Sequence, residues 1–529
     1  MTKNTERISM DKSEHKGINP QIPFQSLASS FSNINIIVFR RLGSILLLPR
    51  EKTRVNMEVF AARSRLTLIL SLLALLSLGF RSSSSHPSSS SELQILTAER
   101  RIDLASHIIR VVLTLKVQND GASPASNVLL AFPPPQVKHL ALIQAAEITG
   151  KKKKKAVHPL DVKPSDHTDG PNGAKFFSIS LRNPLTSGGS VSVEVSYVLT
   201  QSLEPFPVEI SQSEPQLVLY RDSASILSPY AIKQQTTVIR TPSTKVESFT
   251  RIEPSSQIRT ELKYGPYVDQ SPYSFTPILI HFENNNPFAV VEELVREIEI
   301  SHWGNLQITE HYTLVHNGAK HKGGFSRVEY QSRPSISGVS SFKHLVAKLP
   351  PRVHSVYYRD NIGNISTSHL RTSYSKSELE IEPRYPLLGG WKATFVIGYG
   401  LPLQDFLFES NDGKRYLNFT FGCPIAETVV NKITNKVVLP EGSKNPSVVV
   451  PFSVDNRAET KYTYLDIVGR PVVVLEKENV VPEHNSHFQV YYDFHPMFML
   501  AEPLMLTSVF FFLFVAAVAY LHMDISIRK

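Results

Sequence analysis

Histidines, carboxylates and one thiol are the side chains in this sequence that could support catalysis or bind a metal. His302, His311 and His316 lie close together in the chain. Side chains of an extended strand alternate between two faces, so His311 points away from the face shared by His302 and His316. We therefore predict strand histidines on a polar face rather than a metal site. The sequence does not exclude a pair of carboxylates that hydrolyses glycosides, because the fold rather than the sequence spacing sets the geometry of such a pair.

Cys423 is the one cysteine, which excludes an intramolecular disulfide, CxxC redox chemistry and cysteine-based zinc binding. It precedes Pro424, and because free cysteines are usually buried we predict a structural thiol there. The sequence has no HExxH, no Walker A loop, no GxGxxG after a strand and no GxSxG elbow. We assign no catalytic, cofactor-binding or metal-binding residue.

Two Asn-x-Ser/Thr sequons, at Asn364 and Asn418, are candidate glycosylation sites if they are exposed in the lumen of the secretory pathway. Residues 151–155 are five consecutive lysines. We predict a solvated hairpin loop for them rather than a nuclear-localisation or phosphate-binding patch.

The formal net charge of +9 is concentrated at the amino terminus, where residues 1–56 hold nine basic and four acidic residues. The remainder of the chain is near neutral, so we predict no nucleic-acid partner.

An apolar run in residues 66–76 follows Arg63 and Arg65 and precedes the small residues Ser77 and Gly79. This order is typical of a signal peptide, which we predict at residues 57–81 with Met57 as the functional start. Residues 1–56 are then a non-native or unstructured extension. A mitochondrial or plastid transit peptide is the alternative, although four acids are more than such peptides usually contain.

A second apolar run, residues 503–521, contains no charged side chain and is long enough to span a bilayer. Basic residues follow it, so the positive-inside rule predicts a short cytosolic tail at residues 522–529 and a luminal bulk before the helix.

Alternating apolar and polar residues dominate the chain between a Ser-rich linker, residues 82–91, and the membrane helix. Every second residue from Val191 to Leu199 is apolar, as in a half-buried strand. The same pattern occurs in residues 111–117, 308–314 and 488–494, and residues 460–466 and 471–476 read as a hairpin around residues 468–470. The predicted fold is mainly β, with two tandem β-sandwich-like luminal domains, residues 92–287 and 288–497, and one C-terminal transmembrane helix.

A short repeat suggests that one module is duplicated. Residues 115–122 and 314–319 each end a strand in a turn with Asn and Gly, and each is followed by Lys-His-Leu, at residues 138–140 and 343–345. Matches this short also arise by chance, so the duplication is a hypothesis.

Long segments after residue 300 resemble the ribophorin I family, whose members belong to the oligosaccharyltransferase of the endoplasmic reticulum. The segments are residues 301–319 (SHWGNLQITEHYTLVHNGA), 323–331, 337–370, 383–402 (PRYPLLGGWKATFVIGYGLP) and 462–474. A weaker match begins at residues 99–120. Many family members continue into a cytosolic helical tail, whereas this sequence stops at Lys529.

The resemblance implies an accessory, non-catalytic subunit of the complex that transfers a preassembled oligosaccharide from dolichyl diphosphate to Asn of nascent chains. It implies no cofactor, a single-pass type I topology in the endoplasmic reticulum membrane, and an active site on another subunit. Expected partners are the other subunits, the catalytic one included, and nascent polypeptide; contact with the translocon or ribosome is left open.

Two other classes of function remain as alternatives on the sequence alone. One is a luminal glycosidase or peptidase on a β scaffold. The other is a cell-surface adhesion receptor, which the lack of paired cysteines disfavours because extracellular sandwiches commonly rely on disulfides.

Overall fold

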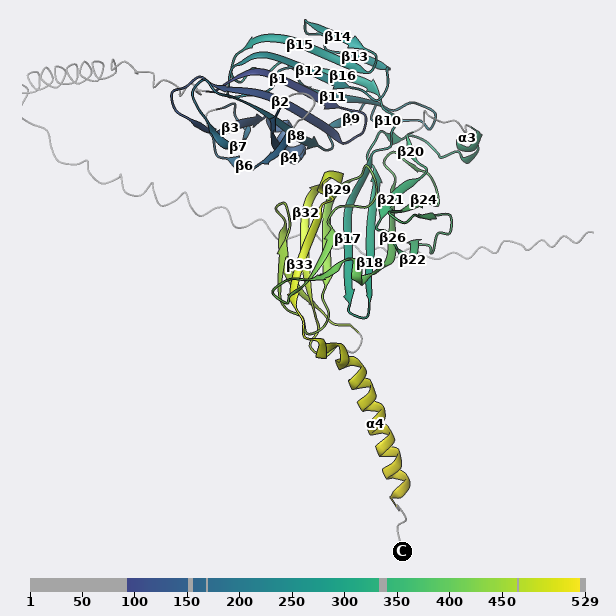
Figure 1. Cartoon of the computed structure of the whole chain (residues 1–529). Coiled ribbons are helices and arrows are strands. Elements are labelled where there is room, and N and C mark those ends of the chain that lie inside the picture. Colours follow the sequence, from purple (N-terminus) through teal and green to yellow (C-terminus); the bar gives the residue numbers. More distant parts are fainter. Residues whose placement is uncertain (1–92, 151–155, 168–169, 333–339, 464–465, 524–529) are drawn as a thin grey trace, which may run out of the picture. The chain divides into compact units, whose positions relative to one another are not determined.

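The computed structural model describes residues 93–150, 156–167, 170–332, 340–463 and 466–523. The predicted extension, signal peptide, Ser-rich linker and lysine run lie outside these residues. Within the compact unit Ser89–Lys529, strands dominate, and they carry the colours from purple through green to yellow in Figure 1. The prediction of a mainly β protein is confirmed.

The first half of the described chain, residues 93–288, contains one hydrophobic core between three sheets. The largest sheet has the order β14 (Ser255–Ile258), β15 (Glu261–Gln270), β12 (Ile232–Arg240), β1 (Leu93–Asp103), β2 (Ile109–Asn119), β8 (Ser190–Leu199), β4 (Leu140–Thr149), β5 (Ala156–Leu160). The others are β13 (Val246–Phe249), β16 (Pro277–Glu283), β11 (Leu217–Ser223), β9 (Leu203–Pro205), and β3 (Ala125–Phe132), β7 (Lys175–Leu185), β6 (Val162–Ser165). In β2 the buried positions alternate with less buried ones, so the apolar alternation of the sequence packs one face of the strand into the core.

The second half, residues 289–500, has its own core, again between three sheets. Its largest sheet has the order β22 (His354–Asp360), β26 (Lys392–Pro402), β18 (Asn305–His316), β17 (Ala289–Ser301), β29 (Val429–Val438), β32 (Arg470–Val480), β31 (Asp455–Lys461). The others are β27 (Leu407–Glu409), β28 (Arg415–Thr420), β33 (His487–Asp493), β30 (Lys444–Val449), and β21 (Leu345–Leu349), β24 (Ser377–Ile381), β23 (His369–Thr372).

Two short strand pairs and a few helices complete the described elements. The pairs are β10 (Glu209–Ile210) with β19 (Lys320–His321) and β20 (Ser341–Phe342) with β25 (Leu387–Leu388). The helices are α2 (Pro134–His139), α3 (Arg327–Ser332), η1 (Leu403–Asp405), η2 (Pro482–His484), η3 (Pro496–Leu500) and α4 (Ala501–His522).

The two halves share one strand order. β1 pairs antiparallel with β2 and parallel with β12, and β17 pairs in the same way with β18 and β29. Even the bulge is shared, because the register shifts between Ile95 and Thr97 in β1 and between Val291 and Glu293 in β17. The smaller sheets correspond as well, since β9-β11-β16-β13 matches β27-β28-β33-β30.

The topology supports the predicted repeat in part. The repeated strand ends belong to β2 and β18, which hold matching places in the two sheets. The Lys-His-Leu match is wrong, because residues 138–140 run from α2 into β4 whereas residues 343–345 lead into β21 of a smaller sheet. Lys-His-Leu therefore recurs by chance at positions that the fold does not equate.

Most strands predicted from alternation are present, and their ends differ by a few residues. The hairpin around residues 468–470 pairs β31 with β32, but β31 ends at Lys461 rather than at Asp466. The chain then makes polar side-chain contacts instead of continuing the ladder, because Asp466 accepts hydrogen bonds from Thr463 and Arg470.

The predicted membrane helix is α4, a helix long and apolar enough to cross a membrane. Its 22 residues span about 33 Å at ~1.5 Å per residue, close to the ~30 Å hydrocarbon core of a bilayer. The two aliphatic hydroxyl groups are satisfied within the helix, since Thr507 donates to the Pro503 carbonyl and Ser508 to the Met505 carbonyl, each at 2.7 Å.

Candidate functional site

The three histidines singled out from the sequence do not converge. His302 lies under Arg415, whose Nη1 donates to Nδ1 at 2.7 Å, so Nε2 carries the proton and donates to the Tyr492 hydroxyl at 2.8 Å. Burial, and then the charge of Arg415, lowers the pKa of His302 to about 4. The neutral imidazole is thus a packing element.

His316 corrects the prediction of a polar face. It is fully buried at the end of β18, while His311 is exposed as alternation requires. The Gly318 N–H donates to Nδ1 at 3.0 Å, which leaves Nε2 to donate to the Ser340 hydroxyl at 3.0 Å. Burial lowers the pKa of His316 to about 4, so the ring is neutral at physiological pH.

Cys423 is buried, which confirms the predicted structural thiol. Burial, and then the nearby Glu310, raises the pKa of Cys423 to about 12. Since the thiolate is the reactive form, this side chain is inert as a nucleophile.

The two sequons differ in environment. Asn364 is exposed between β22 and β23. Asn418 lies within β28, where it pairs with Gln489 of β33, and its Oδ1 is buried without a hydrogen-bond partner. Asn364 is exposed, as an attached glycan requires, whereas Asn418 is half-buried in a paired strand.

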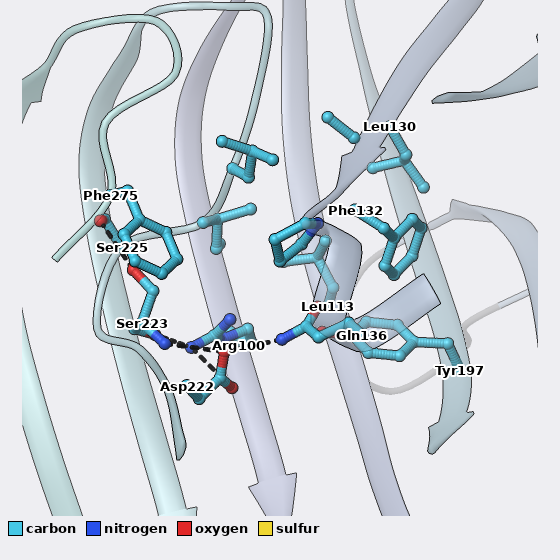
Figure 2. A pocket seen from close by; sticks show the side chains of 14 residues that line it. Arg100, Leu113, Leu130, Phe132, Gln136, Tyr197, Asp222, Ser223, Ser225 and Phe275 are labelled. Atoms are coloured by element: carbon cyan, nitrogen blue, oxygen red, sulfur yellow. Dashed lines mark hydrogen bonds and ion pairs between the residues drawn. The ribbon is translucent and has the colours of Figure 1, made fainter. Parts of the chain in front are cut away.

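A buried arginine in the first half lines a small cavity. Arg100 of β1 lies with Nη2 3.4 Å from Asp222 Oδ2 and also donates to the Ser223 carbonyl, while its Nε is buried without a partner. Asp222 accepts further hydrogen bonds from the Tyr220 hydroxyl at 2.6 Å and from Gln136 Nε2 at 2.7 Å. Figure 2 shows Arg100 and Asp222 facing each other with Gln136 beside them.

This cavity has a volume of about 20 Å³, which is room for a water molecule and not for a sugar or a peptide. Phe132, Tyr197 and Phe275 close around it. Burial, and then the charge of Asp222, raises the pKa of Tyr220 well above its usual value, so Tyr220 remains a hydrogen-bond donor. Apart from Arg100 Nε, the polar groups of Arg100, Asp222, Tyr220 and Gln136 have partners here, which is the geometry of a structural network.

The second half buries a tighter network. Arg296 Nε donates to Glu310 Oε1 at 2.6 Å, and its other nitrogens donate to the carbonyls of Phe421 and Gly422 at 3.0 and 2.8 Å. The Tyr312 hydroxyl donates to Glu310 Oε2 at 2.6 Å, and Tyr399 lies 3.3 Å from Oε1. Each oxygen of this fully buried carboxylate thus has a donor, which leaves none of them free to act as a general base.

The sequence carried a signal for both networks. Arg100 is in phase with the buried Ala98 and Ile102, and Arg296 is in phase with the buried Leu294 and Ile298. A charged residue on the apolar face of a predicted strand indicates a buried ion pair.

An acidic cluster lies where the second half meets α4. Among the described residues, Glu441, Asp466 and Glu502 are the one group of three whose ligand atoms all lie within 4.8 Å of one another. Arg470 already lies among them, 3.1 Å from Asp466 and 3.0 Å from Glu502, and the backbone N–H groups of Ile467 and Val468 donate to Glu441. These contacts give the cluster a structural role as a link to the helix.

An open groove of about 1070 Å³ lies in the second half. Its lining includes Lys348, Arg352, Tyr374, Asp405, Phe406 and His487. Arg352 pairs with Asp405, and Tyr374 is fully exposed. Basic, aromatic and acidic side chains therefore line the groove.

Comparison with known proteins identifies the family. A sequence model of the family described as Ribophorin I matches residues 93–521. The chain is 66% identical over 442 residues to the dolichyl-diphosphooligosaccharide–protein glycosyltransferase subunit 1B of Arabidopsis thaliana, which covers 84% of this chain and 95% of that protein. Subunit 1 of Caenorhabditis elegans is 38% identical over 433 residues, 82% of this chain and 72% of that protein.

Among solved structures, an M1 zinc metallopeptidase from Deinococcus radiodurans is similar over 39% of this chain and 42% of that one, with 12% identity and a TM-score of 0.24. We draw nothing from so low a score. The family match over residues 93–521, and the identity with plant and animal relatives along the same stretch, lead to one conclusion. The chain belongs to the ribophorin I family.

Proposed function

We propose that this chain is a non-catalytic subunit of the oligosaccharyltransferase complex that transfers a preassembled oligosaccharide from dolichyl diphosphate to Asn of Asn-x-Ser/Thr in nascent proteins. Its role is to support assembly and to present the acceptor polypeptide. The observation that carries the proposal is the 66% identity, over 84% of the chain, with a protein named as subunit 1B of that glycosyltransferase.

The buried acids favour an accessory role. Glu310 and Asp222 each accept several hydrogen bonds and face an arginine, and the acids near α4 surround Arg470. A carboxylate that acts on a lipid-linked donor or on an acceptor amide must be accessible and free to bind a proton or a metal. These contacts support the proposal that the active site lies on another subunit.

We also propose a single-pass type I arrangement in the endoplasmic reticulum membrane, with a signal peptide at residues 57–81 and the sheets in the lumen. The luminal domains are residues 92–287 and 288–497, and the change from one hydrophobic core to the other at Phe288 and Ala289 supports this division.

Assembly is tested by purifying the tagged full chain in mild detergent. The expected result is co-purification of the other oligosaccharyltransferase subunits, the catalytic one included. Complex depleted of this chain should still glycosylate a short sequon peptide but lose occupancy on full-length glycoproteins. Recovery of the chain without any such subunit, or loss of activity on the short peptide from an otherwise assembled complex, would overturn the proposal.

The groove that contains Tyr374 is the proposed contact for acceptor polypeptide. A photo-cross-linking amino acid at position 374 should capture nascent glycoproteins in membranes that carry stalled ribosome complexes. Val268, which is exposed on β15 of the first half, is the matched control position. Equal capture at both positions would contradict a specific groove.

Of the two sequons, we propose that Asn364 carries the glycan. Asn364→Gln should remove the mobility shift that an endoglycosidase for high-mannose glycans produces. Asn418→Gln should leave that shift unchanged, because Asn418 is half-buried and paired within the sheet of β28 and β33. A shift that depends on Asn418 would show that glycosylation precedes closure of β28 against its neighbours.

A further inference from the structure

Exposed apolar side chains gather around the start of α4. Trp303 is 69% exposed at the turn between β17 and β18, and Ile467 and Val468 are 67% and 64% exposed in the loop before β32. Met497 and Leu500 of η3, directly before α4, are exposed as well. We call these five residues the juxtamembrane surface. So many large apolar groups from separate turns indicate a contact with something outside the chain.

The turn that carries Trp303 and the segment that carries Met497 and Leu500 are distant in the sequence but contribute to the same hollow. A single hollow of about 140 Å³ is lined by Trp303, Glu441, Arg470, Phe498 and Glu502. The loop with Ile467 and Val468 is fixed to the same place, because their backbone N–H groups donate to Glu441 Oε1 at 2.8 and 2.6 Å.

Arg470 joins this arrangement to the helix. Its guanidinium lies 2.9 Å from Glu299 at the end of β17, 3.1 Å from Asp466 and 3.0 Å from Glu502, and Glu502 belongs to the first turn of α4. The turn of β17 and the loop before β32 are thus held beside the first turn of the apolar helix. A domain tied in this way cannot lift these turns away from the bilayer without breaking the ion pairs.

The backbone of the turn between β17 and β18 leaves the Trp303 indole exposed. Gly304 has a φ of +104°, a backbone conformation that side-chain-bearing residues rarely adopt, and nothing lies within 4 Å of its missing Cβ. Trp303 therefore sits at the tip of a tight turn between two long strands that pair along their whole length.

We infer that the juxtamembrane surface lies in the headgroup region of the leaflet that α4 enters, so that the second half rests on the bilayer. Tryptophan is enriched at this depth because its ring is apolar and its N–H is polar. The surface is continuous with the membrane helix through Met497 and Leu500. Shallow insertion of several apolar side chains then fixes the tilt of the second half, which a lone helix leaves free.

The test uses the fluorescence of the full chain reconstituted in phosphatidylcholine vesicles that contain brominated phosphatidylcholine. The chain has two tryptophans, and Trp391→Phe leaves Trp303 as the probe. We expect a blue-shifted emission, with bromine near the headgroup quenching about twofold more strongly than bromine at mid-bilayer. If Trp391→Phe does not fold, the difference between the native chain and Trp303→Phe gives the same quantity.

The control moves the probe to the other end of the sheet. Asp360 of β22 pairs with Phe395, seven residues along β26 from Pro402, which pairs with Asn305 beside the Trp303 turn. Ile362, exposed just after β22, is therefore ~23 Å away at ~3.3 Å per residue. In the Trp303→Phe, Trp391→Phe background, Ile362→Trp should show aqueous emission without quenching.

Two results would overturn the inference. One is equal quenching of tryptophan at positions 303 and 362. The other is aqueous emission from Trp303 in vesicles combined with protection from acrylamide in the intact complex, which would make the surface a contact with another subunit. Equal quenching, measured on the chain alone, does not bear on whether the chain is an oligosaccharyltransferase subunit, and a contact with another subunit at this surface would agree with that proposal.

Discussion

The two halves of the described chain bury an arginine at the same place in the same kind of sheet, but they neutralise it differently. Arg100 lies opposite Leu113 of β2 and Thr237 of β12. Arg296 lies opposite Glu310 of β18 and Asn435 of β29. Each arginine comes four residues after the bulge of its strand.

Both guanidinium groups reach a carbonyl at the end of the equivalent strand in the facing sheet, Ser223 of β11 and Thr420 of β28. The counterion is not equivalent. Asp222 comes from the facing sheet, whereas Glu310 comes from the neighbouring strand. The shared topology therefore fixes the position of the arginine, because backbone carbonyls of the facing sheet accept its hydrogen bonds in both halves. The position of the paired acid differs between the halves.

The largest expected effect follows from Arg296→Met. The change leaves Glu310 fully buried with only Tyr312 and Tyr399 as donors, and we expect a loss of ~3–5 kcal/mol in the free energy of unfolding. Denaturant unfolding of the detergent-solubilised chain, followed by tryptophan fluorescence, measures it, because Trp303 and Trp391 both lie in the second half.

The double variant Arg296→Met, Glu310→Met is the control. Removing both charges takes away the desolvation cost of the pair, so most of the lost stability should return. A cost under ~1 kcal/mol for Arg296→Met alone would mean that water enters and solvates Glu310, and that the two networks are alike.

Acid is expected to act next, at the junction of the two halves, through histidines that each contribute less than the Arg296 ion pair. The His107 Nε2–H donates to the Ala289 carbonyl, 3.1 Å away, and burial lowers the pKa of both His107 and His316 to about 4. Folded-state values below the ordinary value of about 6.5 mean that the unfolded chain binds protons first as the pH falls.

The contribution of these neutral histidines to the free energy of unfolding is therefore fully present above about pH 6.5. It declines as the pH falls toward 4, by up to ~3 kcal/mol for each imidazole. Melting temperatures between pH 7.5 and 4.5 measure the decline, and His316→Gln should flatten part of it. A melting temperature that stays constant over this range would contradict the buried, neutral state of both rings.

Arg100→Met should cost less than Arg296→Met, about 1–2 kcal/mol. The remaining Asp222 keeps the Tyr220 hydroxyl, Gln136 Nε2 and the Ser223 N–H as donors, at 2.6, 2.7 and 2.7 Å. Hydrogen exchange of peptides from β1 and β11, read by mass spectrometry, reports on the first half. A cost equal to that of Arg296→Met would erase the contrast between the networks.

Sequence alternation was enough to predict most of the strands and the class of fold, because the side chains of a half-buried strand alternate between apolar and polar. The burial of Cys423 followed from the usual burial of free cysteines. It could not predict the partners of the buried charges. Arg296 is 126 residues from the Gly422 carbonyl, and Arg100 is 123 residues from the Ser223 carbonyl. Such pairs are set by how sheets face each other, which no local period records.

The same limit explains His316 and the groove. A histidine at a strand end can face either solvent or core, and only the Ser340 hydroxyl and the Gly318 N–H, brought in by the turn, make burial tolerable. The groove of Tyr374 and Phe406 needs two sheets and several loops to form, so its residues show no common spacing in the sequence.

The smallest expected effect concerns the ion pairs that join the halves. Arg110 of β2 donates to Glu483 at 2.6 Å and to both oxygens of Glu427 at 3.1 and 3.2 Å, and all three side chains are partly exposed. Solvent screens such pairs, so Arg110→Ala should cost ~1 kcal/mol or less, and less again at about 0.5 M salt. Melting temperatures of the solubilised chain at two salt concentrations measure both quantities.

The junction also buries Ile108, Val198 and Val429 in one apolar cluster, which salt does not weaken. A loss above ~3 kcal/mol would therefore mean that charge rather than apolar packing holds the two halves together.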